Sequence, residues 1–244
     1  FIAEALCAMD RQLRARGGQL LVLHGHATQV IPALANATGA TGLICAEDFE
    51  PATRARDASV KEDLPTTTRM VQVLDHLIRA PQQLLKADGT PYKVFTPFYK
   101  QWRASLGPTD DAEYAVEDAG RYADGAALRA AALAAGLEVL RPEAGAACLL
   151  QPLGYHYTPD PHWPVADAHG RLHAFIEQRL ARHPLARDQL AEGGTSQLSP
   201  YLRFGLLSIR ECLRVALAAG QGEKWIAELG WREFCHHLLF HFPD

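Results

Sequence analysis

The chain has 244 residues, which is room for one large domain or two of modest size. Hydrophobic residues make up 48% of the sequence and charged residues 21%, which excludes a wholly disordered chain because enough apolar surface is present to form a core. The formal net charge of -4 excludes a uniformly basic nucleic-acid coat protein but is compatible with a local basic groove. Five scattered cysteines without a C-x-x-C pair argue against a disulfide framework or a zinc site, so we expect no metal and a cytoplasmic protein. No apolar run is long enough to predict a transmembrane helix.

The first hundred residues alternate between helical and extended apolar patterns. Strands separated by helices of this length predict βαβ units and an α/β, Rossmann-like parallel sheet. No G-x-G-x-x-G sequence follows any of the expected strands, which argues against an NAD site in this region. Helices are expected over 1–16, 27–37 and 53–64, and extended segments over 19–24, 41–46 and 70–78.

The rest of the chain changes character twice. Prolines interrupt the pattern between 107 and 165, where one Ala-rich helix is expected over 124–135. Further on the pattern is helical. Ser208 and Glu211 form a capping-box pattern that opens one helix over 208–220, and a last helix is expected over 223–241. We predict an α/β domain over 1–106, an interdomain linker over 107–165 and the start of an all-helical domain over 166–244.

Both ends of the chain look cut. The sequence begins with Phe1 inside a helical pattern and stops at Asp244 directly after another helical pattern. We therefore expect an excerpt of a longer protein, truncated at both ends.

A hydroxyl-rich turn lies in the helical part. Gly193 and Gly194 allow the backbone to approach a ligand closely, and three hydroxyls follow within 195–199. Pro200 is suited to the first turn of a helix. Hydroxyls and free N–H groups at a helix start favour phosphate binding. The alternative is an ordinary loop with an N-cap serine.

A second pattern lies in the last expected helix. Glu228, Trp231, Arg232 and Cys235 share one face of that helix, and Trp225 precedes Glu228 by three residues. A carboxylate, an indole and a guanidinium on one face suit stacking on a base or another flat ring. The alternative is a core tryptophan beside a surface Arg–Glu pair.

Two further groups are expected to be structural. The aromatic stretch over 91–102 is interpreted as a hydrophobic anchor between prolines. His236, His237 and His241 lack the glutamate of an H-E-x-x-H motif, so stacked or hydrogen-bonded roles are expected for them rather than metal binding.

Four motifs follow one another along the chain, namely residues 92–98 (YKVFTPF), 187–188 (RD), 194–205 (GTSQLSPYLRFG) and 228–234 (ELGWREF). In this order they resemble the DNA photolyase and cryptochrome family. Their order and spacing resemble the class that repairs cyclobutane pyrimidine dimers in bacteria, and the resemblance runs through essentially the whole chain. It implies an N-terminal α/β domain that holds an antenna chromophore, a long linker, and a helical FAD-binding domain. Relative to that plan, the chain is expected to lack the first strand and most of the flavin domain.

The resemblance also implies roles for individual residues. Glu228 and Trp231 are implied to be catalytic and to line the cavity for a flipped-out dimer. His183 stands where the family usually has a tyrosine, twelve residues before Thr195. The residues implied to bind FAD are His183, Thr195, Ser196, Gln197, Leu198, Ser199, Trp225, Glu228 and Arg232. Those implied to bind DNA are Arg187, Glu228, Trp231, Arg232 and Cys235, with Arg203 as a further positive charge.

The implied activity is that of a deoxyribodipyrimidine photo-lyase. Reduced FAD absorbs blue light and donates an electron to the dimer, the cyclobutane ring splits, and the electron returns. We expect a monomer that acts on damaged DNA and binds no membrane, with the 244-residue chain alone inactive. The alternatives are a cryptochrome-like flavin photoreceptor without repair activity and an α/β binding protein without photochemistry. Thr90 stands where folate-binding members often carry a carboxylate, which leaves the antenna open between a folate, a deazaflavin and none.

Overall fold

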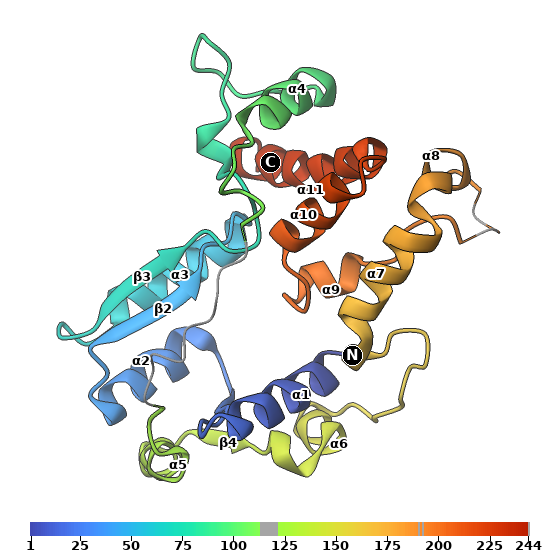
Figure 1. Cartoon of the computed structure of the whole chain (residues 1–244). Helices are drawn as coiled ribbons and strands as arrows, with labels where there is room; N and C mark the ends of the chain where they lie inside the picture. Colours follow the sequence, from blue (N-terminus) through green and yellow to red (C-terminus); the bar gives the residue numbers. More distant parts are fainter. Residues whose placement is uncertain (113–121, 190, 192, 244) are drawn as a thin grey trace. The chain divides into compact units, whose positions relative to one another are not determined.

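The computed structural model describes residues 1–112, 122–189, 191 and 193–243, and they divide into two compact units (Figure 1). No helix in this described part of the chain is both long and apolar enough to span a bilayer. The first unit comprises Phe1–Cys45, Ala52–Gln72 and Val116–Ala166, and the second comprises Ala46–Pro51, Val73–Ala115 and Asp167–Asp244.

The first unit contains the alternating helices and strands that the sequence pattern predicts. The opening helix ends as its glycines suggest, because Gly17 adopts a φ of +81° and the Gly18 N–H donates to the Leu13 carbonyl (2.8 Å). The elements of this unit, some of whose end residues pass into the second unit, are α1 (Ile2–Ala15), β1 (Val22–His24), α2 (Ala27–Thr38), β2 (Gly42–Ala46), α3 (Pro51–Asp63), β3 (Arg69–Val73), α5 (Gly125–Ala134), β4 (Glu138–Leu140) and α6 (Ala146–Leu150).

The strands do not form the single parallel sheet that the pattern predicts. Within the described residues β1 pairs with β4 in antiparallel register, with Val22 opposite Leu140, and β2 pairs separately with β3. The β2–β3 pair is parallel, because Arg69 donates to Thr41 at the start of both strands and Glu47 donates to Val73 at their ends. The expectation of one parallel sheet is therefore corrected for β1 and β4. A hydrophobic run identifies a strand but contains no information about its partner or direction.

The core of the first unit joins α1 to the segment after residue 122. Ala3 and Cys7 lie one turn apart on α1, and they pack against Leu140 of β4 and Leu149 of α6. Asp10 is also buried on α1 and accepts hydrogen bonds from Leu20 N–H (3.0 Å) and Arg14 Nε (2.6 Å). Helix α1 thus contacts the segment that follows it through the hydrogen bonds of Asp10, and it contacts β4 and α6 through its buried apolar side chains.

The second unit is dominated by helices. The structure confirms the predicted last helix over its full range, and Ser208 caps α10 by accepting a hydrogen bond from the Arg210 N–H (3.2 Å). The helices are α4 (Phe95–Ser105), α7 (Ala168–Gln178), α8 (His183–Ala186), α9 (Ser199–Arg203), α10 (Ile209–Ala218) and α11 (Glu223–His241), with short 3-10 turns such as η1 (Pro81–Gln83).

Helix α11 is the central element of the second unit, in contact with α4, α8, α10 and η1 (Figure 1). Its buried residues lie on several faces, as expected for a helix enclosed by others. Gly230 allows a close approach of α4, because a Cβ atom there would lie 2.7 Å from the Tyr99 ring. The position of α11 is thus fixed from several sides, and this matters for the side chains that it presents.

Candidate functional site

The hydroxyl-rich turn owes its shape to close packing against α8. A Cβ atom on Gly194 would lie 2.3 Å from the Ala186 carbonyl oxygen, so this position requires glycine. Leu198 anchors the turn with 1% of its surface exposed, and Gln197 takes a left-handed φ of 54°. The turn leads into α9, which begins at Ser199 with Pro200 in its first turn, as the sequence predicts for the proline, but its N-cap is Leu198 rather than a serine.

This turn lines a cavity of about 360 Å³, here called the turn cavity. The residues Thr195 to Ser199 form one part of its wall, and α8 with the residues after it supplies His183, Arg187 and Asp188. The helix α11 contributes Trp225 and Glu228. The predicted phosphate turn and the predicted helical face therefore lie on one cavity.

A second cavity of about 420 Å³, here called the helix cavity, is lined by successive turns of α11. Trp225, Glu228, Arg232 and His236 follow one another at helical spacing along its wall. The residues shared with the turn cavity are Ser196, Ser199, Trp225 and Glu228, and the other lining residues are Glu50, Leu202, Arg203 and Leu229.

Charged groups in the two cavities are arranged in pairs. Arg187 donates a hydrogen bond to the Glu228 carboxylate, and both side chains are a little over one-third exposed. Arg203 lies 3.8 Å from the Glu50 carboxylate. Arg232 donates to the His76 carbonyl (2.5 Å), and burial lowers the pKa of this guanidinium.

Two histidines at the cavities are held in the neutral form. Burial lowers the pKa of His236 to about 4, and the positive charge of Arg232 acts in the same direction. Burial also lowers the pKa of His183, whose ring packs edge-on against Phe175. The Nδ1 atoms of both histidines are buried and have no hydrogen-bond partner among the described residues. Buried polar atoms of this kind are rare and are frequently partnered by a ligand or by water.

Two predicted site residues do not line either cavity. Trp231 is 42% exposed, and its indole stacks on the Phe95 ring with centroids 3.7 Å apart and an interplanar angle of 10°. Cys235 lies on the exposed side of α11. The remaining predicted residues, His183, Arg187, Thr195, Ser196, Gln197, Leu198, Ser199, Trp225, Glu228 and Arg232, line one cavity or both.

The structure adds residues that the sequence analysis does not assign to the site. His236 follows Arg232 by four residues, so extending the helical face by one turn would have found it. Glu50 lies in the turn after β2 and is remote in sequence from α11, and no pattern in the sequence connects the two.

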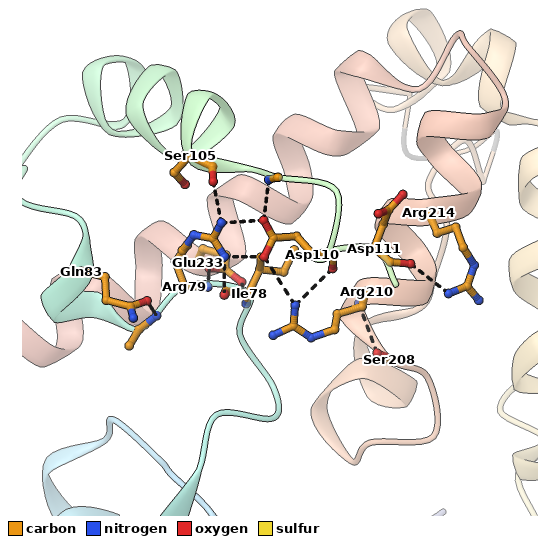
Figure 2. A network of polar contacts seen from close by, with 12 residues as sticks. Ile78, Arg79, Gln83, Ser105, Asp110, Asp111, Ser208, Arg210, Arg214 and Glu233 are labelled. Atoms are coloured by element: carbon orange, nitrogen blue, oxygen red, sulfur yellow. Dashed lines mark hydrogen bonds and ion pairs between the residues drawn. The ribbon is translucent and has the colours of Figure 1, made fainter. Parts of the chain in front are cut away.

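A buried polar network contacts α11 through Glu233. The Glu233 carboxylate accepts hydrogen bonds from the backbone N–H groups of Ile78 (2.6 Å) and Arg79 (3.1 Å) (Figure 2). The Arg79 guanidinium in turn binds both oxygens of Asp110 at 2.5 Å, and Arg210 of α10 donates to the Asp110 carbonyl (3.1 Å). The helix that carries the cavity residues is thus connected by hydrogen bonds to the segment after α4 and to α10.

The histidines at the end of α11 have structural contacts. His237 is buried, accepts a hydrogen bond at Nε2 from the Tyr92 N–H (3.1 Å), and has its Nδ1 3.3 Å from the Pro81 carbonyl oxygen. His241 approaches the same carbonyl with Nε2 at 3.2 Å. These are the hydrogen-bonded roles that the sequence analysis expects for both residues.

Comparison with known proteins identifies relatives along the whole chain. The family model described as DNA photolyase matches residues 1–117. A deoxyribodipyrimidine photo-lyase from Synechococcus sp. is 33% identical over 259 residues, which cover 100% of this chain and 51% of the relative. A class III photolyase structure from Agrobacterium tumefaciens is 26% identical with a TM-score of 0.68, over 99% of this chain and 49% of that one.

A more distant structure has the same fold. A cryptochrome from Synechocystis sp. superimposes with a TM-score of 0.71 at 15% identity, over 98% of this chain and 51% of that one. The chain spans about half the length of the relatives that it matches. From the family model and the whole-chain matches we conclude that the chain belongs to the DNA photolyase family.

Proposed function

We propose that this protein takes part in light-dependent repair of cyclobutane pyrimidine dimers in DNA, with FAD as its cofactor. The observation that carries the proposal is the shared lining of the two cavities, where the hydroxyl-rich turn and the Glu228 face of α11 lie together. Several curated relatives are named deoxyribodipyrimidine photo-lyase, which supports this activity over a general binding role.

The cavity residues fit a cofactor that has phosphates and a flat ring. Thr195, Ser196 and Ser199 supply hydroxyl groups to the wall of the turn cavity, where they can donate hydrogen bonds to phosphate oxygens. His183 lines the turn cavity and His236 the helix cavity, and each has a buried Nδ1 atom without a hydrogen-bond partner among the described residues. We infer that these residues, with Gln197, Leu198, Trp225, Glu228 and Arg232, hold FAD. When bound and reduced, FAD supplies the light-excited electron that splits the dimer.

The DNA partner is proposed from the exposed groups. Arg187 and Arg203 provide local positive charge for phosphates on a chain whose net charge is -4. The Trp231 indole is stacked on Phe95, also contacts Phe234 and is 42% exposed, so the exposed part of the ring is available for a base to stack on. Extruding a damaged base from the duplex is less costly than extruding an intact one. Glu228 would then accept hydrogen bonds from the edge of the extruded dimer.

A repair assay under blue light tests the proposal. The 244-residue chain alone is expected to be inactive, so the assay uses the FAD-loaded full-length protein, which should convert a dimer-containing oligonucleotide to intact thymines in the light and not in the dark. Protein that binds FAD and leaves the dimers unchanged in the light would favour the cryptochrome-like alternative. Protein that binds no flavin would refute the proposal altogether.

A further inference from the structure

Glu228 is the charged residue among the four that line both cavities. It lies on α11 between Trp225 and Arg232, and its carboxylate is bound by Arg187, which lies just after α8. The ion pair therefore connects the hydroxyl-rich turn cavity with the helix cavity.

The Arg187–Glu228 ion pair is partly exposed to solvent, so little free energy is needed to break it. The side chains of Arg187 and Glu228 are 37% and 38% exposed, and ion pairs of such exposure contribute little to stability. The structure has one hydrogen bond between this pair, from Arg187 Nη1 to Glu228, whereas a phosphate group can accept two parallel charge-assisted hydrogen bonds from a guanidinium. An incoming phosphate is therefore a stronger partner for Arg187 than Glu228 is.

Arg187 also supplies the positive charge in the wall of the turn cavity. Among the described residues lining this cavity it is the one permanent positive charge, since burial keeps His183 neutral. The carboxylate of Asp188 lies 3.5 Å from Arg187 Nε but is 79% exposed, so it is a weak competitor. In the structure this positive charge is paired with Glu228, which lines both cavities.

We propose that Arg187 exchanges Glu228 for a phosphate group that enters the turn cavity, and that the exchange releases the Glu228 carboxylate to a ligand in the helix cavity. This inference rests on the proposed function and adds to it a coupling between its two ligands. The phosphate belongs either to the cofactor or to the DNA backbone, since both offer the same chemistry to a guanidinium.

The exchange has a thermodynamic consequence. The ligand that supplies the phosphate binds more weakly than it otherwise would, because it must break the Arg187–Glu228 ion pair. Once it has done so, the Glu228 carboxylate is released, and a second ligand can bind Glu228 without breaking the pair itself. Each ligand consequently tightens the binding of the other. Until the ligand that supplies the phosphate binds, the Glu228 carboxylate takes the place of that phosphate beside Arg187.

A double-mutant cycle on Arg187 and Glu228 tests the exchange. FAD is titrated into the apoprotein in one arm, and a short undamaged duplex is titrated into the FAD-loaded protein in the other. Each arm uses the wild type, Glu228→Gln, Arg187→Gln and the double variant. Arg187→Lys is the conservative variant. Glu177→Gln, at an exposed position of α7, is the charge-matched control. Circular dichroism establishes that every variant is folded.

The expected result is that Glu228→Gln tightens the binding of one of the two ligands by about threefold to fivefold relative to the same substitution in the Arg187→Gln background, a difference that isolates the ion pair from any contact of Glu228 with the ligand. The difference should persist with Arg187→Lys. A response in the FAD arm assigns the phosphate to the cofactor, and a response in the duplex arm assigns it to the DNA.

Three results would overturn the exchange. Glu228→Gln can leave both affinities unchanged in either background, it can tighten binding equally with and without Arg187, or Glu177→Gln can tighten binding as much. The last two would indicate a general charge effect. A protein that repairs dimers in the light but shows one of these results loses only the exchange, whereas a protein that binds neither FAD nor DNA refutes the proposed function as well.

Discussion

The indole Nε1 of Trp102 donates a hydrogen bond to the carboxylate of Glu233 (3.2 Å), and both side chains are almost fully buried, one on α4 and the other on α11. The other partners of this carboxylate, the N–H groups of Ile78 and Arg79, are donors as well. One acceptor group thus satisfies three buried donors from two segments remote in sequence. This group holds α11 in the position that its cavity residues require.

We expect Glu233→Gln to destabilise the protein by about 1–3 kcal/mol, because an amide nitrogen would face at least one donor and leave it unsatisfied. The free energy of unfolding from urea denaturation at pH 7 measures this. Glu177→Gln on the exposed part of α7 is the matched control and should change stability by less than about 0.5 kcal/mol. Equal stability of the two variants would show that the three hydrogen bonds contribute nothing in net terms.

Protonation of His237 should make the fold sensitive to acid. Burial lowers the pKa of His237 to about 4, and its Nε2 accepts from the Tyr92 N–H, which the protonated ring cannot do. Since the unfolded chain takes up this proton near pH 6.5 and the folded chain only near pH 4, the free energy of unfolding falls as the pH falls through that window.

The variant His237→Gln isolates this effect. Its amide can accept from Tyr92 and donate to Pro81, but it does not titrate. The difference in unfolding free energy between pH 7 and pH 5 should be smaller in this variant than in the wild type, by about 1–2 kcal/mol. Identical pH dependence in the two proteins would contradict the prediction.

Gly194 should be needed for the shape of the turn cavity. A Cβ atom at this position would lie 2.3 Å from the Ala186 carbonyl, so Gly194→Ala must move the turn away from α8. Titration of FAD should show at least a tenfold loss of affinity if the turn binds the cofactor, since a ligand site loses contacts when its wall shifts.

The control for this change is Gly205→Ala. Gly205 has a φ of +69° but open space around its Cβ position, so this variant introduces backbone strain without a clash. It should be destabilised by about 1 kcal/mol while keeping its FAD affinity. Equal loss of FAD affinity in both variants would show that general destabilisation, rather than the turn, is responsible.

Trp231→Ala should weaken binding to dimer-containing DNA by about tenfold, because stacking of a base on an aromatic ring contributes about 1–3 kcal/mol. Fluorescence anisotropy with a dimer-containing and an undamaged duplex measures the change. Tyr155→Ala, which removes another exposed aromatic ring in the first unit, is the control and should have no effect. A similar loss for both duplexes would mean that Trp231 does not distinguish the lesion.

Much of the local structure follows from the sequence. The bounds of α11 agree with the predicted 223–241, and Ser208 caps α10 as predicted. Ser208 forms only half of the predicted capping box, however, because Glu211 pairs with His169 (2.9 Å) and does not reach back to the cap. Predictions of this kind succeed where the deciding contacts lie within a few residues, and they fail where a distant side chain competes.

What the sequence by itself determined is the periodicity of the helices, the hydroxyl-rich turn at 195–199 and the face of α11 that carries Trp225, Glu228 and Arg232. Only the tertiary structure decided that β1 pairs with β4 in antiparallel register, that Arg187 binds Glu228, and that Glu50 and His236 join the helix cavity. The physical reason is range: periodicity and capping act over one or two helical turns. Strand partners, ion pairs and cavity walls depend on contacts between segments that are far apart along the chain.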